Sequence, residues 1–390
     1  MSNPVWQSLA GQHAVIEQLT GYQTITAPTH AWLFTGPPGS GRSLAARAFA
    51  QTLQCEQSDP AARGCGTCQA CTTIGTGTHA DVNIVTTEKV SYAIEDVRDL
   101  VANAHDRPST ARWRIIIIED ADRMTERATN VLLKAIEEPP ERTIWMLSAP
   151  SPADVLVTIR SRTRHVQLVI PSVEDVAQLL TARDGIDPQL AQTCARASQS
   201  HVGVARWLAR SPDARQRRDM IVHLPLSIRS ASAAMEAAAN LHKLVQDEAE
   251  ASAADRNAAE RASLLRSLGL TDDEPIPPKL RVHVRRMEDN QTARNRRAVH
   301  DALDRAMIDL SGIYRDLLLL HVTPEAELIN AHMHQKLRDY AATVSAEHCL
   351  NALEAITLAR KRLAGNVPPL LALEAMLLAF IPRTRRHAPL

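Results

Sequence analysis

The residues of this chain that could do chemistry begin with a glycine-rich turn. Residues 36–43 read Gly-Pro-Pro-Gly-Ser-Gly-Arg-Ser, follow the apolar run 31–34 and precede an alanine-rich segment. A strand, a glycine-rich turn and a helix in this order favour a phosphate-binding P-loop over an ordinary turn, because glycines let backbone N–H groups curl round phosphate oxygens at the positive end of the helix. The candidate nucleotide-binding residues here are Gly36, Gly39, Gly41, Arg42 and Ser43.

One residue of this turn departs from the pattern. A P-loop carries lysine before its Ser or Thr, whereas this chain has Arg42 before Ser43. Lysine presents a compact ammonium to phosphates, while arginine is longer and planar and needs a differently shaped nest. We therefore expect a loop with the backbone shape of a P-loop but altered phosphate-binding chemistry. The sequence leaves open whether ATP or ADP still binds there without hydrolysis.

Two acidic residues follow a second apolar run. Residues 115–118 are four isoleucines, and Glu119 and Asp120 come directly after them. A buried parallel strand that ends in acids holds Mg²⁺ and orients the attacking water in P-loop ATPases. The usual order is Asp then Glu. The reversed order would displace each carboxylate by more than about 1 Å, a misplacement that can cost about a hundredfold in rate.

Four clustered cysteines form the second candidate site, and they are Cys55, Cys65, Cys68 and Cys71. In a reducing compartment such clustering indicates a metal site, because disulfides are disfavoured and tetrahedral zinc takes four thiolates. An iron–sulfur cluster is the alternative, but the usual fourth ligand with its trailing proline is missing downstream. Four thiolates leave no open coordination position, so the expected zinc pins a loop and does not catalyse. Cys194 and Cys349 stand alone and are expected to be small buried hydrophobes.

Composition limits the classes of protein that these sites can belong to. The 390 residues predict two to three domains, and 45% hydrophobic with 23% charged residues is typical of a soluble globular chain. Lys+Arg and Asp+Glu both number 44, so no overall basic field attracts nucleic acid or an anionic membrane. With 3% aromatics, the chain is not expected to stack single-stranded bases on its own.

The chain also lacks the expected marks of export. Residues 1–7 have no basic stretch followed by an apolar core, so they do not form a secretory signal. The most apolar tract, residues 367–382, is shorter than a membrane span needs and is expected to be a buried helix. We therefore expect a cytoplasmic protein without membrane contact.

Strand and helix patterns alternate around the candidate sites. Strands are expected at residues 30–34, 80–86, 114–118 and 143–148. Helices are expected around Val15, Ile16 and Leu19, and at residues 43–55, 94–101, 125–138 and 153–159. Pro139 and Pro140 end the fourth of these helices, and Ser161 and Arg162 follow the last.

Several of these segments together resemble one family. Residues 30–43, the four-cysteine insert, residues 115–122, residues 130–140 and residues 161–163 agree in order and spacing with bacterial DNA polymerase III clamp-loader subunits of the AAA+ class, and within them with the delta-prime subunits. The resemblance covers most of residues 1–170. It implies an α/β fold with an AAA+ P-loop parallel-sheet domain at 1–170 that carries the zinc insert at 55–71, a small helical lid at 171–210, and an all-helical collar and oligomerisation domain at 211–390.

The resemblance also assigns roles to single residues. Ser161 and Arg162 lie where the family's Ser-Arg-Cys supplies an arginine finger to the ATP site of the neighbouring subunit, with Thr163 in place of the cysteine. The alternative for Arg162 is a solvated member of a basic cluster with its neighbours. Ala149 occupies the position of a polar sensor, and Gly203 falls where motor subunits carry a sensor arginine.

These assignments imply a non-catalytic stator of the DNA polymerase III holoenzyme, a DNA-directed DNA polymerase complex. The chain would contribute Arg162 in trans while a neighbour hydrolyses ATP to load the sliding clamp on primed DNA, and its own ATPase activity is expected to be absent. The implied partners are the gamma/tau and delta subunits through the AAA+ and collar domains, the sliding clamp, and primed DNA only within the complex. The alternatives are a gamma/tau-type motor and a free-standing zinc protein that binds nucleic acid.

The last part of the sequence is expected to be helical. Residues 246–300 are crowded with both charge signs and interrupted by prolines, which suggests a long solvated helical hairpin or a partly disordered insert. Apolar residues between 299 and 317 then recur at three- and four-residue steps and define a helix face.

Overall fold

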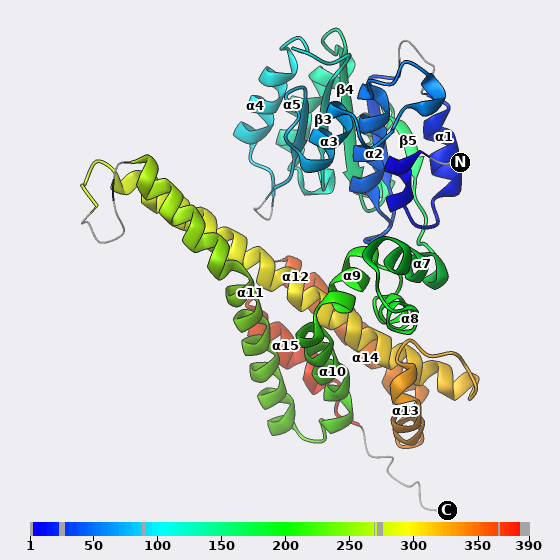
Figure 1. Ribbon diagram of the computed structural model, residues 1–390. Helices are drawn as coiled ribbons and strands as arrows, with labels where there is room; N and C mark the ends of the chain where they lie inside the picture. Colours follow the sequence, from blue (N-terminus) through cyan, green and yellow to red (C-terminus); the bar gives the residue numbers. More distant parts are fainter. Residues whose placement is uncertain are drawn as a thin grey trace, which may run out of the picture. The chain divides into compact units, whose positions relative to one another are not determined.

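The computed structural model describes residues 3–22, 28–87, 91–268, 270, 276–365 and 367–382. The chain divides into two compact units, Met1–Arg210 and Ser211–Leu390 (Figure 1). Among the described residues, no helix is both long and apolar enough to cross a membrane.

A parallel sheet of five strands forms the centre of the first unit. The strands are β1 (Ala31–Thr35), β2 (Val82–Val85), β3 (Arg114–Ile118), β4 (Thr143–Ala149) and β5 (Arg164–Gln167), in the order β2-β3-β4-β1-β5. All four strand pairs are parallel, so the carboxyl ends of the strands meet at one edge. β4 lies between β1 and β3, and this arrangement separates the glycine-rich turn from the acidic residues by one strand.

Helices cover both faces of this sheet. On one face, η1 (Pro4–Ser8), α1 (His13–Thr20) and α2 (Arg42–Gln54) share a core with Trp32 and Phe34 of β1. On the other face, α4 (Ile94–Ala104) and α5 (Glu126–Glu137) share a core with Leu33. Burial on both faces explains the continuous apolar runs of β1 and β3, and it confirms the predicted α/β class.

The segment that leads to Arg162 differs from its prediction. The expected helix over residues 153–159 is wrong: a 3₁₀ turn, η4 (Pro152–Asp154), is followed by extended backbone at Val155 and then by the four-residue helix α6 (Val157–Arg160). Pro152 starts the turn, and the Ser151 side chain accepts a hydrogen bond from the N–H of Ala153, which caps it. The two pieces therefore do not form one continuous element.

Strand β5 was not expected. Only Val166 of its four residues is buried, because β5 is an edge strand, so its sequence lacks the apolar run that marks the central strands.

Three helices complete the first unit. They are α7 (Val173–Asp184), α8 (Pro188–Ala197) and α9 (Val202–Arg210). A capping box between Ser172 and Asp175 starts α7. Gln12 connects the region before α7 to the glycine-rich turn: its Nε2 donates to the carbonyl oxygens of Val169 at 2.7 Å and Ser40 at 3.3 Å.

The described part of the second unit is helical. Its elements are α10 (Pro212–Ser227), α11 (Ala231–Ser267), α12 (Arg281–Val322), η5 (Ala331–Met333), α13 (His334–Ala341), α14 (Ala346–Ala364) and α15 (Pro369–Leu378). They share one core, in which the rings of Tyr314 and Phe380 lie 4.7 Å apart. The buried-helix prediction for residues 367–382 holds for one face of α15 only, since Leu371 on the other face is 58% exposed.

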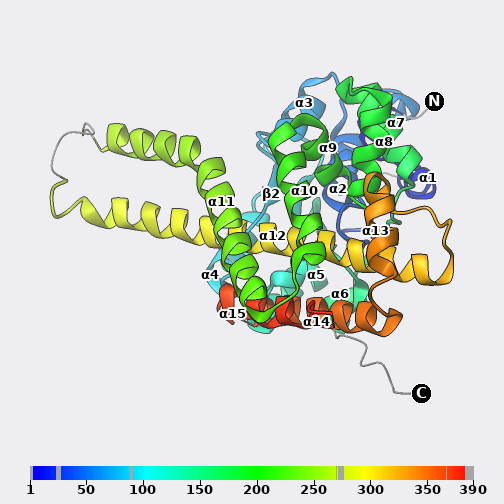
Figure 2. The ribbon, with the colours of Figure 1, turned by 90° about the horizontal axis from the view of Figure 1, so that it is seen from below.

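The charged insert at 246–300 forms part of a long helical hairpin. α11 and α12 run side by side beyond the other helices of their unit (Figure 2). A small separate apolar cluster that includes Leu265, Val284 and Met287 holds the outer part together. Of the two sequence interpretations, the described residues form the hairpin; residues 269 and 271–275 lie outside the described part.

Candidate functional site

The glycine-rich turn has the predicted position between β1 and α2. Gly39 and Gly41 have φ angles of 86° and 93°, a left-handed conformation that favours glycine. Arg42 is the first residue of α2, so the loop delivers the chain directly into the amino end of that helix. The loop is therefore built as the sequence indicates, with Ser43 in the first helical turn.

Arg42, the cationic residue of the loop, binds the backbone of the same loop. The Nη1 of Arg42 donates a hydrogen bond to the carbonyl oxygen of Gly36. Burial lowers the pKa of Arg42, although the charges of Asp120 and Asp122 oppose this shift. The guanidinium thus reaches across the turn to the Gly36 carbonyl oxygen. The lysine of an ordinary P-loop has a compact ammonium in place of this planar group.

A histidine that the sequence analysis did not single out packs on the same loop. A Cβ added to Gly39 would lie 2.5 Å from His201 Cγ and 2.6 Å from His201 Cα. His201 directly precedes α9, and its Nδ1 accepts a hydrogen bond from the N–H of Val204 at 3.3 Å. Gly203, the position expected to lack a sensor arginine, lies beside this ring: a Cβ there would be 3.4 Å from His201 Cε1. No motif marks His201, so only the fold reveals it.

The acidic residues lie at the carboxyl end of β3 as predicted, but each has a cationic neighbour. Glu119 Oε1 is 3.0 Å from Arg47 Nη2, which comes from α2. Asp120 has a φ of 53°, and its Oδ2 is 3.7 Å from Arg123 Nε. The Glu119 carboxylate is therefore already neutralised by a residue of the loop's own helix.

The expected sensor position carries no polar group. Ala149 is the last residue of β4, is fully buried, and pairs with Thr35 at the end of β1. Its methyl group cannot hydrogen-bond a phosphate or a water.

Arg162 lies on the surface two residues after α6. Its Nε is 2.7 Å from Glu137 Oε1, and its Nη1 donates to the carbonyl oxygen of Thr158 at 3.0 Å and to Ser161 Oγ at 3.2 Å. The three basic residues of this segment have different surroundings, because Arg164 lies over the rings of Tyr22 and Trp32. The structure thus places Ser161 beside Arg162, and Arg162 and Arg164 contact different groups.

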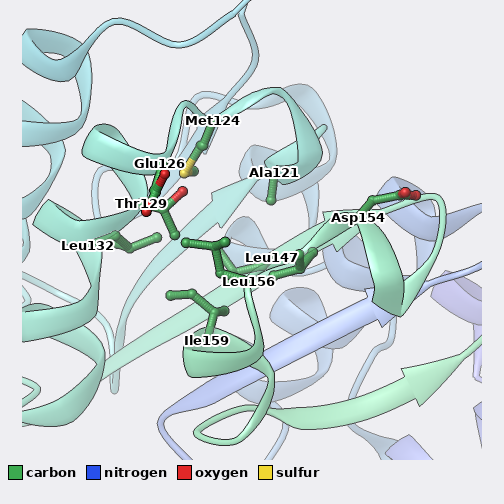
Figure 3. Close-up of a pocket in the computed structure, with 10 residues that line it drawn as sticks. Ala121, Met124, Glu126, Thr129, Leu132, Leu147, Asp154, Leu156 and Ile159 are labelled. Carbon is green, nitrogen blue, oxygen red and sulfur yellow. The ribbon is translucent and has the colours of Figure 1, made fainter.

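A small cavity marks the contact between α5 and the segment that carries Arg162. It has a volume of about 100 Å³, and Figure 3 shows Leu132 and Thr129 of α5 facing Leu156 and Ile159. Ile159 is 1% exposed and Leu132 is 1% exposed, so the short helix α6 is seated firmly on α5. α5 in turn carries Glu137 as its last residue.

The four predicted cysteines come together. Their sulfur atoms all lie within 4.8 Å of one another, with 3.7 Å from Cys55 to Cys65 and 3.9 Å from Cys55 to Cys68. Four thiolates at about 2.3 Å around one tetrahedral ion would lie about 3.8 Å apart. This spacing fits a single metal ion, whereas an iron–sulfur cluster distributes four thiolates over two or four irons and does not bring all of them this close together.

Local backbone geometry favours the thiolate form of Cys65, whereas burial raises the pKa of Cys71. Burial opposes ionisation of Cys65, but hydrogen bonds from Thr67 and from the N–H of Cys68 lower its pKa to about 6. Cys55 follows the last residue of α2, and Cys68 caps α3 (Gln69–Thr76) by accepting from the N–H of Cys71. A metal here would connect two helix ends. Cys194 and Cys349 are buried and lie outside this group, as expected.

The insert also supports the start of the chain. The N–H of Val5 donates to the carbonyl oxygen of Gly64 at 3.3 Å, and Asn3 Nδ2 donates to the carbonyl oxygens of Ala61 and Arg63. Gly64 has a φ of 87°, and a Cβ there would lie 2.8 Å from Val5 Cγ2. The cysteine module therefore fixes η1 against α2.

Comparison with known proteins gives a consistent picture. A family model described as DNA polymerase III, delta subunit, matches residues 11–171. The DNA polymerase III subunit gamma/tau of Mycobacterium tuberculosis is 35% identical over 163 residues, which cover 39% of this chain and 28% of that protein. The subunits delta' of Yersinia pestis and Pseudomonas aeruginosa are 32% identical over 170 residues and 36% identical over 154 residues, covering 43% and 39% of this chain and 50% and 45% of those proteins.

The parallel sheet and the glycine-rich turn between β1 and α2 are those of an α/β domain with a P-loop-like turn. Residues 11–171 match the DNA polymerase III delta-subunit family model, and part of the chain is similar to DNA polymerase III gamma/tau and delta' subunits. The alignments span half or less of the length of these relatives.

Proposed function

We propose that this chain is a non-catalytic stator subunit of a DNA polymerase III clamp loader. One contrast carries the proposal. In the chain's own candidate site, Arg42 of the phosphate loop binds the Gly36 carbonyl oxygen, and Glu119 at the end of β3 is paired with Arg47, whereas Arg162 is held on the surface at 40% side-chain exposure. The chain is thus poorly equipped to hydrolyse ATP and well equipped to act on the ATP of a neighbour.

The proposed contribution is an arginine finger in trans. Phosphoryl transfer spreads negative charge over the phosphoryl oxygens, and an arginine supplied from a neighbouring subunit stabilises this charge by about a thousand- to a hundred-thousandfold in rate. Arg162 would supply this charge to a gamma/tau-type subunit, with Ser161 supporting its Nη1. The energy of hydrolysis would open the sliding clamp for loading on primed DNA.

Any nucleotide in this chain's own loop would meet two obstacles. It would have to displace Arg42 from the Gly36 carbonyl and His201 from Gly39. We therefore assign turnover to the partner, and static binding of ATP or ADP here requires rearrangement of both side chains.

Zinc is the proposed structural metal. Cys55, Cys65, Cys68 and Cys71 offer four sulfurs and no open coordination position, so the ion would fix the insert against α2 and take no part in ATP hydrolysis.

The proposed partners are gamma/tau-type and delta-type subunits. The second unit offers exposed leucines for helical contacts, since Leu350 and Leu358 of α14 are 49% and 46% exposed. Equal numbers of acidic and basic residues support DNA contact only within the complex, and a replication role is consistent with a cytoplasmic location.

A gamma/tau-type motor is the second candidate, favoured by the 35% identity to the mycobacterial gamma/tau subunit. ATP hydrolysis by the purified chain distinguishes the two. A stator shows no turnover above background, and native mass spectrometry with the partner subunits shows it in a mixed complex with one zinc. Turnover that is lost in Arg42→Ala would identify the motor.

A further inference from the structure

The exposed guanidinium of Arg162 forms an ion pair with Glu137 of α5. We propose that Glu137 is a positioning residue, which orients Arg162 toward the ATP of the neighbouring subunit. This inference rests on the proposed function of Arg162 and adds a residue to it. The pair joins the last residue of α5 to the turn after α6, 25 positions later in the sequence.

An exposed arginine without such a contact would sample many rotamers, because its long side chain has high rotamer entropy. Here the Nε is held by Glu137, and the Nη1 is held by the Thr158 carbonyl and Ser161 Oγ. Contacts at two different nitrogens define the plane of the guanidinium. Within the described residues Nη2 has no hydrogen-bond partner, so this nitrogen is left to bind an oxyanion.

Glu137 is itself attached to a rigid element. α5 packs into the core of the sheet through Leu132 and Ile136, which are 1% and 0% exposed. The α6 segment shares this core through Val155 and Ile159, and Figure 3 shows Ile159 on the side of α5. The carboxylate and the backbone that carries Arg162 are therefore placed by one helix, which is the condition for a reproducible direction.

The pair is also open to a neighbour. The side chains of Arg162 and Glu137 are 40% and 43% exposed, so a phosphate from another subunit can approach without unfolding this segment. Nε and Nη2 share one edge of the guanidinium, so an anion would bind the Nη2 N–H that points away from Nε and from the Glu137 carboxylate.

The next residue supplies a matched control. Glu138 is also exposed and also at the end of α5, and its N–H is bonded to the Lys134 carbonyl. Its carboxylate forms no ion pair within the described residues. Removing its charge changes the net charge of this surface as much as removing that of Glu137, but leaves Arg162 in place.

The experiment measures steady-state ATP hydrolysis by the complex reconstituted from this chain and the gamma/tau-type and delta-type subunits of its source organism, with clamp and primed DNA. Glu137→Ala should lower kcat about two- to fivefold, the worth of an exposed ion pair, without changing the KM for ATP. Glu137→Gln keeps an acceptor and should lower kcat less. Glu138→Gln should match the parent.

A double variant tests whether Glu137 acts through the finger. Glu137→Ala should have no further effect when combined with Arg162→Ala; a further decrease would overturn the positioning role. If both Glu137 variants hydrolyse ATP at the parent rate or faster, the positioning role of Glu137 is overturned. The proposed function still stands in that case if Arg162→Ala slows the complex. A parent rate for Arg162→Ala would refute the proposed function itself. Thermal unfolding and zinc content of each variant establish that folding is unchanged.

Discussion

Loss of one cysteine of the insert should remove the metal and destabilise the first unit. The perturbation is Cys65→Ser, which replaces the thiol with the lowered pKa by a poor ligand of similar size. The sulfur spacing of 3.7 and 3.9 Å around Cys55 already fits a tetrahedral ion, so the parent site needs little rearrangement to bind zinc.

The magnitude follows from the ligand count. Apparent binding free energies of structural zinc are about 10–16 kcal/mol, so the share of one of four thiolates, about 2.5–4 kcal/mol, is the smallest loss expected. Binding to the folded state stabilises it, so the variant should lose a similar free energy of unfolding. For a unit of 210 residues, about 3 kcal/mol corresponds to a decrease in Tm of roughly 6–12 °C.

The assay combines metal analysis with thermal unfolding of the full chain. The parent should contain one zinc per chain and the variant much less. Cys194→Ala is the control, because this buried cysteine lies outside the cluster and its loss should leave zinc in place. Full zinc content in Cys65→Ser, or iron with sulfide in the parent, would refute the reasoning.

The remaining predictions concern the loop and a buried carboxylate. Arg42→Lys should leave the isolated chain without ATP turnover, because Glu119 stays paired with Arg47; phosphate release at a motor's rate would contradict this. Burial opposes ionisation of Asp81, but hydrogen bonds from the backbone of Ser109 and residues 110–111 hold its pKa below the ordinary range. Asp81 should therefore contribute stability above about pH 4 that is lost as pH falls, and Asp81→Asn should lower the free energy of unfolding by about 2–4 kcal/mol at pH 7 and by less at pH 3, as measured in urea. An equal loss at both pH values would show that the charge is not what matters.

The sequence was most informative where the physical signal is local. Four isoleucines before Glu119 define a buried strand, and glycines at φ angles of 86° and 93° define the turn before Arg42. Short cysteine spacing likewise predicted the cluster, because three of the four thiols lie within seven residues of one another.

Contacts between distant residues could not be read from one sequence. Arg47 and Glu119 are 72 positions apart, and nothing in the sequence indicates that they pair. Glu137 lies in a segment that was recognised only as a helix end before two prolines, so its contact with Arg162 depended on how α6 is seated on α5. His201 was missed for the same reason, because its contact with Gly39 depends on how the segment after α7 and α8 packs on the glycine-rich turn.

Local sequence signals were misleading where helix-forming composition and a proline pointed to different structures. Residues 153–159 have helix-forming composition, but Pro152 starts a 3₁₀ turn and Val155 is extended, so the helix begins only at Val157. β5 has a single buried residue, Val166, because an edge strand needs little apolar surface.

The central claim is that Arg162 acts on a neighbour's ATP and not on the chain's own loop. The most direct test is the ATP hydrolysis rate of the reconstituted complex in which only this chain carries Arg162→Ala or Arg162→Lys. Both variants should assemble with full zinc content, yet hydrolyse ATP and load clamps more slowly than the parent. Lysine should be nearly as damaging as alanine, because one ammonium cannot keep the contacts with Glu137, Thr158 and Ser161 and also present a nitrogen to the phosphate. Parent rates for both variants, together with a slow complex for Arg42→Ala, would contradict the account.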